Sequence, residues 1–428
     1  MEIMEERMRK EIEAFAEEYD GESVVIYGCT AFAKNIFLHL REMGIPVTAF
    51  VDNDAKKAGD KYLGVDIFLP RQYLLPLDTK KRIIVCSVHE NEMLDSLYEM
   101  GYGDENIRCI DVRNETMWDS PEYAREQMEL VREGIKYYEE LQLKHGDGTM
   151  ILIAPEASGD TFLSCAYLQT WYRLYNIADY IIVGSNRNIV DIAQMYGLSE
   201  RVILISKEKR RAVLAAYVFI GEQLHMKPLS GWELRCRNSY VANPKFPFLF
   251  KESFKYETFE LGKEAVPEYP QKNRTARENE FPYIKRKKSI IISPYAYSSP
   301  APLIERKIWE EIVHVLCKKG YGVYTVGYGE KEPPIKGTQR IQFTYGEACA
   351  VLEYAGGFLA ARSGLCDIVH MAECRQLIIY GRNIRNKHIF DFFSLKMNYP
   401  DFRGWEIIFE NYEAADFVKC VTDYFHSI

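Results

Sequence analysis

The chain has 428 residues, 47% of them hydrophobic and 27% charged, which is typical of a folded globular protein and excludes disorder over most of its length. The formal net charge of −8 argues against nucleic acid as a partner, because neutralising phosphates requires a basic face. No segment approaches the roughly 18 uncharged apolar residues that a membrane-spanning helix needs, and the length predicts about three domains.

The N-terminal segment and the cysteines favour a cytoplasmic protein. Residues 1–21 are dense in Glu and Arg, lack the apolar core of a secretory signal and are expected to form a helix. The ten cysteines are scattered and include no Cys-x-x-Cys pair, so neither a zinc site nor a dithiol motif is predicted. Unpaired thiols suit a reducing compartment.

Residues 22–113 alternate strand and helix patterns, which predicts a Rossmann-like domain with a parallel sheet. A dinucleotide loop reads Gly-x-Gly-x-x-Gly after the first strand. Here only Gly28 remains, with Thr30 and Ala33 in the other two places. Asp52 ends the second strand, where an acid could bind a ribose. Gly28, Thr30 and Asp52 are therefore candidates for a nucleotide-like loop, and the alternative is a turn of the same kind without a ligand.

A longer motif runs through the same region. It comprises Tyr27-Gly28, Phe50-Val51-Asp52-Asn53-Asp54, Lys57, Gly59 and Gly64-Val65-Asp66-Ile67. In this pattern the region resembles the N-terminal domain of bacterial sugar acyltransferases and related polysaccharide-biosynthesis proteins. The resemblance implies the fold of that domain. It does not imply acyl transfer, because the left-handed helix of those enzymes is missing.

Residues 114–148 read as a connecting helix, and residues 149–284 then repeat the alternation of strand and helix. Gly159 and Asp160 follow the first strand of this region and open a helix. An aspartate there stabilises the free amide groups of the first helical turn. The alternative is a general base on a sugar hydroxyl, since ligands bind at the carboxyl ends of parallel strands.

Residues 285–428 form the third such region. Its first strand leads into a polar loop whose hydroxyl groups could hold a phosphate, and the residues are Ser293, Tyr295, Tyr297, Ser298 and Ser299. A later strand leads into Arg362, Ser363 and Gly364, a turn suited to phosphate with a cation beside it. Asp367 would repel phosphate, so we assign it to a ribose, to Arg362 or to helix capping. An ordinary loop and a structural Arg362–Asp367 ion pair are the alternatives.

These motifs together resemble the two halves of a GT-B glycosyltransferase, nearest to the ADP-heptose:lipopolysaccharide heptosyltransferase family. The resemblance covers about residues 149–425. The alternation of strand and helix predicts an α/β fold of three Rossmann-like domains, and the resemblance implies that the last two, an acceptor half (149–284) and a donor half (285–428), form a GT-B pair. It also implies that Asp160 is the base that activates the acceptor. Of the family's donor motif, Asp-[Ser/Thr]-Gly-x-x-His, this chain keeps Ser363 and Gly364, with Arg362 and Asp367 at the outer positions.

The expected function is transfer of a hexosyl or heptosyl group from a nucleotide sugar to a glycan or lipid-linked acceptor, in lipopolysaccharide or capsule synthesis. An Asp-x-Asp motif occurs only in the turn at Asp52–Asp54 of the first domain, so neither a metal nor another cofactor is expected. The sequence leaves open the donor nucleotide and sugar, the acceptor, the retaining or inverting outcome, and the oligomeric state.

Two other functions stay open. One is a non-catalytic nucleotide-sugar-binding or scaffold protein of a polysaccharide assembly. The other is an NAD-dependent sugar-modifying enzyme that uses the domain at 22–113. The basic run Lys285–Lys288 is a solvated linker or a peripheral contact with anionic lipid at the inner face of the cytoplasmic membrane.

Overall fold

The computed structural model describes residues 11–87, 90–110, 121–230, 249–271, 281–296, 304–381 and 387–427. The chain divides into two compact units. The first comprises Met1–Arg132 with Trp232–Pro247, and the second comprises Glu133–Gly231 with Phe248–Ile428. The helix α5 (Pro121–His145) runs across the boundary between the two units.

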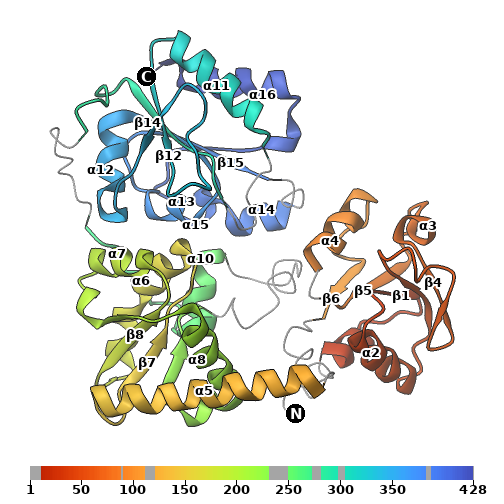
Figure 1. Cartoon of the computed structure of the whole chain (residues 1–428). Coiled ribbons are helices and arrows are strands. Elements are labelled where there is room, and N and C mark those ends of the chain that lie inside the picture. Colours follow the sequence, from red (N-terminus) through yellow and green to blue (C-terminus); the bar gives the residue numbers. More distant parts are fainter. Residues whose placement is uncertain are drawn as a thin grey trace. The chain divides into compact units, whose positions relative to one another are not determined.

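The first unit is built on a six-stranded sheet in the order β3-β4-β2-β1-β5-β6 (Figure 1). All neighbouring strands are parallel except β3 and β4, which form an antiparallel pair. The strands are β1 (Ser23–Tyr27), β2 (Val47–Val51), β3 (Lys61–Tyr62), β4 (Val65–Phe68), β5 (Lys81–Val85) and β6 (Ile107–Cys109). The helices are α2 (Ala31–Glu42), α3 (Pro70–Leu74) and α4 (Glu90–Glu99).

The second unit contains two sheets, both wholly parallel. The smaller has the order β10-β7-β8-β9. Its strands are β7 (Met150–Ile153), β8 (Tyr180–Gly184), β9 (Val202–Leu204) and β10 (Met226–Pro228), and its helices are α6 (Ser158–Leu174), α7 (Arg187–Met195) and α8 (Lys207–Ile220). Because β7 lies between β8 and β10, the strand order reverses at β7, with α6 following that strand.

The larger sheet has the order β13-β12-β11-β14-β15-β16. Its strands are β11 (Ser289–Ser293), β12 (Gly322–Val326), β13 (Gln339–Ile341), β14 (Gly356–Ala361), β15 (Arg375–Tyr380) and β16 (Trp405–Ile408). Its helices are α11 (Arg306–Lys318), α12 (Tyr345–Ala355), α13 (Gly364–Ile368), α14 (Lys387–Phe393), α15 (Leu395–Asn398) and α16 (Ala414–Tyr424). Numbered from β11, this is the order 3-2-1-4-5-6 of a doubly wound fold, whose ligand crevice lies where the order reverses, between β11 and β14.

Local chemistry explains why these elements form. Ile290, Ile291 and Ile292 of β11 are fully buried, as expected for a parallel strand covered by helices on both faces. The helix α12 begins at a capping box between Thr344 and Glu347 and ends at Gly356, which adopts a left-handed conformation with φ 101°. Such signals are local, so the sequence predicts these elements well.

A short irregular segment lies between the two sheets of the second unit in chain order. It contains α10 (Phe250–Ser253) and a π-helical turn at Phe254–Thr258. Phe250 packs on Phe393 with ring centroids 5.4 Å apart, and Phe259 packs on Trp171 of α6 at 5.9 Å. The segment therefore contacts both α6 and the C-terminal helices of the same unit.

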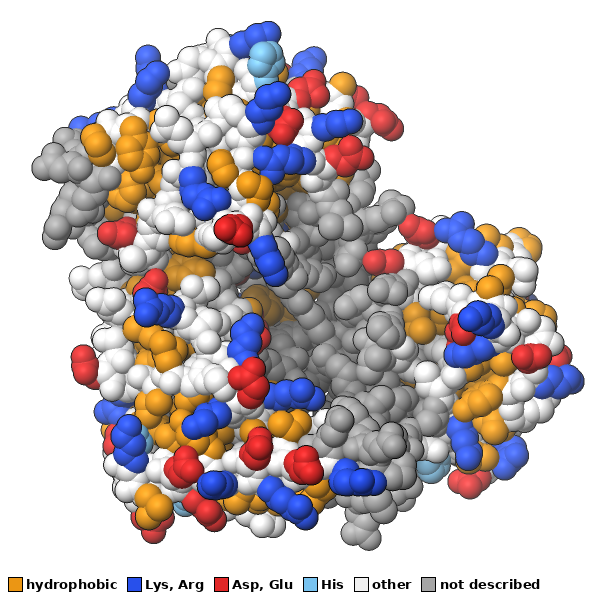
Figure 2. Space-filling view, viewed as in Figure 1, with side chains coloured by type: hydrophobic (Ala, Val, Ile, Leu, Met, Phe, Trp, Pro, Cys, Tyr) orange, Lys and Arg blue, Asp and Glu red, His pale blue; other side chains and the backbone are white. Residues whose placement is uncertain are grey.

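The structure confirms a mixed α/β chain with parallel sheets. The predicted division at 1–21, 22–113, 114–148, 149–284 and 285–428 stays a prediction. In the described part of the chain, no helix combines the length and the apolar character that crossing a bilayer requires. On the face drawn in Figure 2, Lys and Arg side chains are interspersed with Asp and Glu.

Candidate functional site

The candidate donor site lies at the carboxyl ends of β11 and β14. Ser293 ends β11 opposite Ala360 of β14, and it is 5% exposed. Two residues after β14 the turn Ser363–Gly364 begins α13. The two donor-side motifs are therefore neighbours in space, at the point where the strand order of this sheet reverses. This is the position at which open α/β sheets bind ligands.

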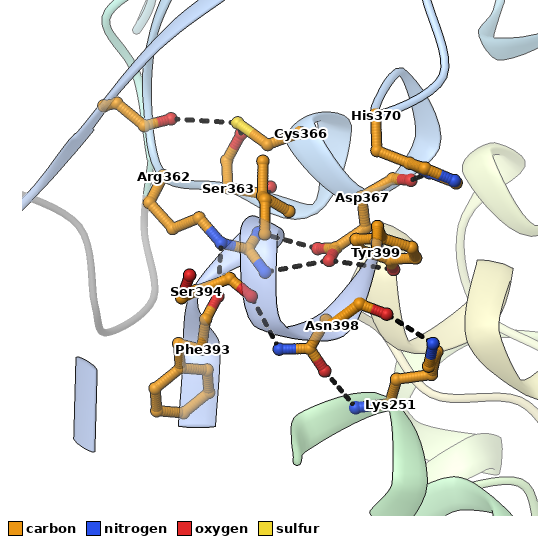
Figure 3. A network of polar contacts seen from close by, with 12 residues as sticks. Lys251, Arg362, Ser363, Cys366, Asp367, His370, Phe393, Ser394, Asn398 and Tyr399 are labelled. Atoms are coloured by element: carbon orange, nitrogen blue, oxygen red, sulfur yellow. Dashed lines mark hydrogen bonds and ion pairs between the residues drawn. The ribbon is translucent and has the colours of Figure 1, made fainter. Parts of the chain in front are cut away.

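Arg362 and Asp367 form a buried ion pair inside this turn (Figure 3). The two guanidinium nitrogens donate to the two carboxylate oxygens at 2.7 and 2.8 Å, and the residues are 3% and 2% exposed. Burial by itself lowers the pKa of Arg362, but the charge of Asp367 outweighs it, so the pKa of the guanidinium is raised. Of the roles predicted for Asp367, the structure shows the pairing with Arg362.

The pair is tied to the rest of its sheet by further hydrogen bonds. Arg362 also donates to the carbonyl of Ser363 at 2.7 Å and to that of Phe393 at 3.4 Å. The hydroxyl of Tyr399 donates to Asp367 at 3.1 Å. Burial, followed by the charge of Asp367, raises the pKa of Tyr399 well above its usual value, so this hydroxyl stays protonated and remains a donor. The guanidinium of Arg362 is thus committed to partners within the chain.

The first turns of α6 and α13 touch backbone to backbone. A Cβ atom built on Gly159 would lie 2.9 Å from Cα of Gly364 and 2.9 Å from a carboxylate oxygen of Asp367. A Cβ atom on Gly364 would lie 2.3 Å from the amide nitrogen of Gly159. All three distances are shorter than real Cβ contacts, so only glycine fits at either place. The predicted acceptor motif and the predicted donor motif therefore meet directly.

Asp160 lies in the first turn of α6 and is partly exposed. The residue that precedes the helix is Ala157, whose side chain cannot cap it, so Asp160 supplies the negative charge at this helix terminus. The hydroxyl of Ser230 donates to its carboxylate at 3.4 Å, and the hydroxyl of Ser164 donates to its backbone carbonyl at 2.7 Å. Ser230 reaches this position because it follows β10, the neighbour of β7.

The polar loop after β11 is described only in part. Tyr295 donates through its hydroxyl to the carbonyl of Pro333, while Tyr297, Ser298 and Ser299 lie outside the described residues. Arg306, the first basic residue after this loop, donates to the carbonyl of Pro334 at 2.6 Å and to Glu310 at 3.2 Å. Tyr295 and Arg306 thus both hold the segment that follows β12.

The nucleotide-like loop of the first unit is filled by its own side chains. Gly28 has φ 106°, a conformation that favours glycine, and Thr30 caps α2 by accepting from the amide of Ala33 at 3.3 Å. Asp52 accepts from the amide of Cys29 at 2.9 Å and from Lys57 at 2.9 Å. The carboxylate predicted to bind a ribose is therefore bonded within its own turn.

These contacts also set the charge of Asp52. Burial raises its pKa, but hydrogen bonds from Lys57 and from the amides of Asp54 and Cys29 outweigh burial, so its pKa is lowered. Burial and the charge of Asp52 raise the pKa of Cys29 to about 12. The thiol beside the loop is therefore neutral at physiological pH and is a poor nucleophile.

Sequence reasoning missed Arg210 of α8, which is 6% exposed. Its Nε and one terminal nitrogen donate to the carbonyl of Ala154 at 2.9 and 2.8 Å, directly after β7. The sequence did contain a signal for its burial. Arg210 lies three residues before the buried Val213, and residues three apart share one side of a helix. Ser230 was also missed, and it had no local signal, because only the pairing of β10 with β7 brings it to Asp160.

Among the residues that the structure describes, no group of three or more His, Cys, Asp or Glu side chains could hold a metal ion. Comparison with known proteins gives limited similarity. No family model matches the chain, and no curated protein matches it either.

Among solved structures, the chain is similar to the iron-containing dodecameric glycosyltransferase TibC from enterotoxigenic E. coli, at 15% identity and a TM-score of 0.36 over 54% of this chain and 59% of that one. It is similar to E. coli ADP-heptose lps heptosyltransferase II at 12% identity and a TM-score of 0.41, over 65% and 98% of the two chains. For a glycosyl transferase of family 9 from Veillonella parvula the identity is 12%, the TM-score 0.36 and the coverage 65% and 92%. The match thus spans less than two thirds of TibC.

Proposed function

We propose that the second unit is a GT-B glycosyltransferase that moves a sugar from a nucleotide sugar to a glycan or lipid-linked acceptor of a surface polysaccharide. The contact between Gly159 and Gly364 carries the proposal. It joins the helix terminus that bears Asp160 to the turn Ser363–Gly364, which lies where the 3-2-1-4-5-6 sheet reverses its order. A carboxylate that can act as a base and a turn whose amides can bind phosphate, on two helix starts in contact, suit sugar transfer from a nucleoside diphosphate.

In this mechanism the diphosphate of the donor lies against Ser293, Tyr295 and the turn Ser363–Gly364. Backbone amides and hydroxyl groups bind its oxygens. The Arg362–Asp367 pair acts indirectly, because it fixes the backbone of the turn. Asp160 accepts the proton of the acceptor hydroxyl, the acceptor oxygen bonds to the anomeric carbon, and the bond from that carbon to the diphosphate breaks. The nucleoside diphosphate leaves with the bonding electrons.

Replacing Asp160 with Asn tests the base. D160N should keep its thermal stabilisation by the donor and lose transfer by about 10²–10⁴-fold, the usual contribution of a general base. The matched control is E156Q, which neutralises an exposed carboxylate of the same loop that accepts from Ser185 at 2.9 Å. E156Q should keep its turnover. Unchanged turnover of D160N would remove Asp160 from the mechanism.

The ligand class is tested by thermal shift with a panel of nucleotides and nucleotide sugars. Stabilisation by a nucleoside diphosphate supports the transferase. Stabilisation by NAD alone would instead support a sugar-modifying enzyme in the first unit, and no response to any ligand would favour a scaffold. Because the carboxylate of Asp52 is bonded to Cys29 and Lys57, we propose an accessory role for the first unit, which resembles the acyltransferase N-terminal domain.

We also propose a peripheral contact with anionic lipid through Lys285–Lys288. All four side chains are exposed, and they precede β11, at the sheet edge opposite the donor turn. Lipid bound there would leave the carboxyl edge open to substrates. The variant K285Q/K287Q/K288Q should bind anionic vesicles more weakly than K207Q/K209Q/R211Q, which removes three exposed charges from α8. Equal binding of both variants would reject the contact.

A further inference from the structure

Two buried serine hydroxyls join the first turn of α6 to the chain that follows β10. Ser164 and Ser230 are both 0% exposed. Ser164 donates to the backbone carbonyl of Asp160 at 2.7 Å and contacts the carbonyl of Leu229. Ser230, the next residue along, directs its hydroxyl to the Asp160 carboxylate at 3.4 Å. Among the described residues, Ser164 therefore contacts two backbone carbonyls, while Ser230 contacts the ionisable group.

The backbone around this pair is fixed from two sides. Leu229 donates its amide to the carbonyl of Ile153 at 2.8 Å, which continues the pairing of β10 with β7. Arg210 holds the carbonyl of Ala154, the residue after that strand. The backbone immediately before Ser230 is therefore held to β7, which brings Ser230 to the side of Asp160.

A hydroxyl that donates to a carboxylate favours its ionised form, which is the form a general base needs. A hydrogen bond of this length often tightens only when substrate is bound. We propose that Ser230 is a positioning residue, which orients the Asp160 carboxylate toward the acceptor and keeps it ionised. This inference rests on the proposed function, in which Asp160 takes the acceptor proton.

Two other charged groups near this end of α6 make hydrogen bonds of their own. Asp367 lies beside Gly159, but its charge is balanced by the bidentate pairing with Arg362. Arg210, from α8, directs two nitrogens to the carbonyl of Ala154. Ser230, from the chain that follows β10, directs its hydroxyl to the Asp160 carboxylate itself.

The test compares S230A with S164A. In S230A the acidic limb of the kcat/KM profile should move up by about one pH unit, since a hydrogen bond to a charged group is lost. At pH values below the pKa that sets this limb, a shift of one unit lowers kcat/KM about tenfold. Donor binding should stay unchanged. S164A removes a hydroxyl of equal burial that does not touch the carboxylate, so its acidic limb should stay in place.

A direct titration of the Asp160 side chain by carbon-13 NMR, in the full chain without substrate, gives a second readout. Its pKa should rise in S230A and not in S164A. If S230A does not fold, S230C is measured, since it keeps a small side chain with a weaker donor and should give a smaller shift. Equal titration curves in the wild type, S230A and S164A would overturn the proposal.

Failure of the proposed function and failure of the role proposed for Ser230 would give different results. Full activity of D160N would refute the proposed base, and the titration of Asp160 in S230A would still report the contact. Conversely, an inactive D160N with an unmoved profile in S230A would keep the base and overturn the role of Ser230. In the D160N background, S230A should cause no further loss of activity, because Ser230 acts through Asp160.

Discussion

Replacing Asp367 with Ala removes one half of the most deeply buried ion pair among those described above. The change takes away both oxygens that receive the Arg362 guanidinium, at 2.7 and 2.8 Å. It also removes the acceptor of the Tyr399 hydroxyl. Arg362 is 3% exposed, so its charge cannot be solvated without a movement of the surrounding chain.

The magnitude follows from that geometry. Leaving a buried charge without its partner costs about 3–5 kcal/mol of unfolding free energy. The lost hydrogen bond from Tyr399 adds about 1 kcal/mol. An apolar replacement of both partners avoids the unpaired charge, so R362M/D367L should be more stable than D367A. Which of the two variants is more stable is thus a sharper prediction than the unfolding free energy of either one.

The assay is urea unfolding followed by circular dichroism, with D179A as the control. Asp179 accepts from Arg201 at 2.6 Å, and the two side chains are 56% and 37% exposed. The same Arg–Asp chemistry in water should contribute only about 0–1 kcal/mol. Similar small losses for D367A and D179A would refute the reasoning, because they would mean that burial of the Arg362–Asp367 pair has no energetic consequence.

Two further predictions concern backbone packing and pH. G159A should destabilise the second unit by about 1–3 kcal/mol, because its Cβ meets the carboxylate of Asp367 at 2.9 Å, whereas G262A, with no atom within 4 Å, should be nearly neutral in thermal unfolding. D52N should destabilise the first unit by about 1–2 kcal/mol at pH 7, as the hydrogen bond from Lys57 to a charged group is lost. Because the folded pKa of Asp52 is lowered, its contribution is complete above the unfolded pKa of about 4 and is lost as the pH falls through the folded value. A difference between wild type and D52N that persisted at about pH 2 would contradict this sign.

Several elements were predicted closely from local pattern. The unbroken apolar run Tyr180–Gly184 forms a strand, and the helix Tyr345–Ala355 lies between a capping box and a glycine, as such local patterns predict. Short edge strands such as Gln339–Ile341 and Trp405–Ile408 were not predicted. Three or four residues are too few for the alternation of apolar and polar side chains to distinguish a strand from a loop. The Arg362–Asp367 pair was predicted as one of several alternatives. The two residues are five positions apart at the start of a helix, a spacing that permits a contact but does not require one.

The sequence by itself determined the alternation of strand and helix, and it placed Asp160, Ser363 and Gly364 at the starts of helices that follow buried strands. These features depend on periodicity and capping within about a dozen residues. Only the tertiary structure decided that Gly159 meets Gly364 and that Ser230 meets Asp160. Those contacts depend on which strands become neighbours and on how closely two helix termini pack, and no local pattern in the chain encodes either.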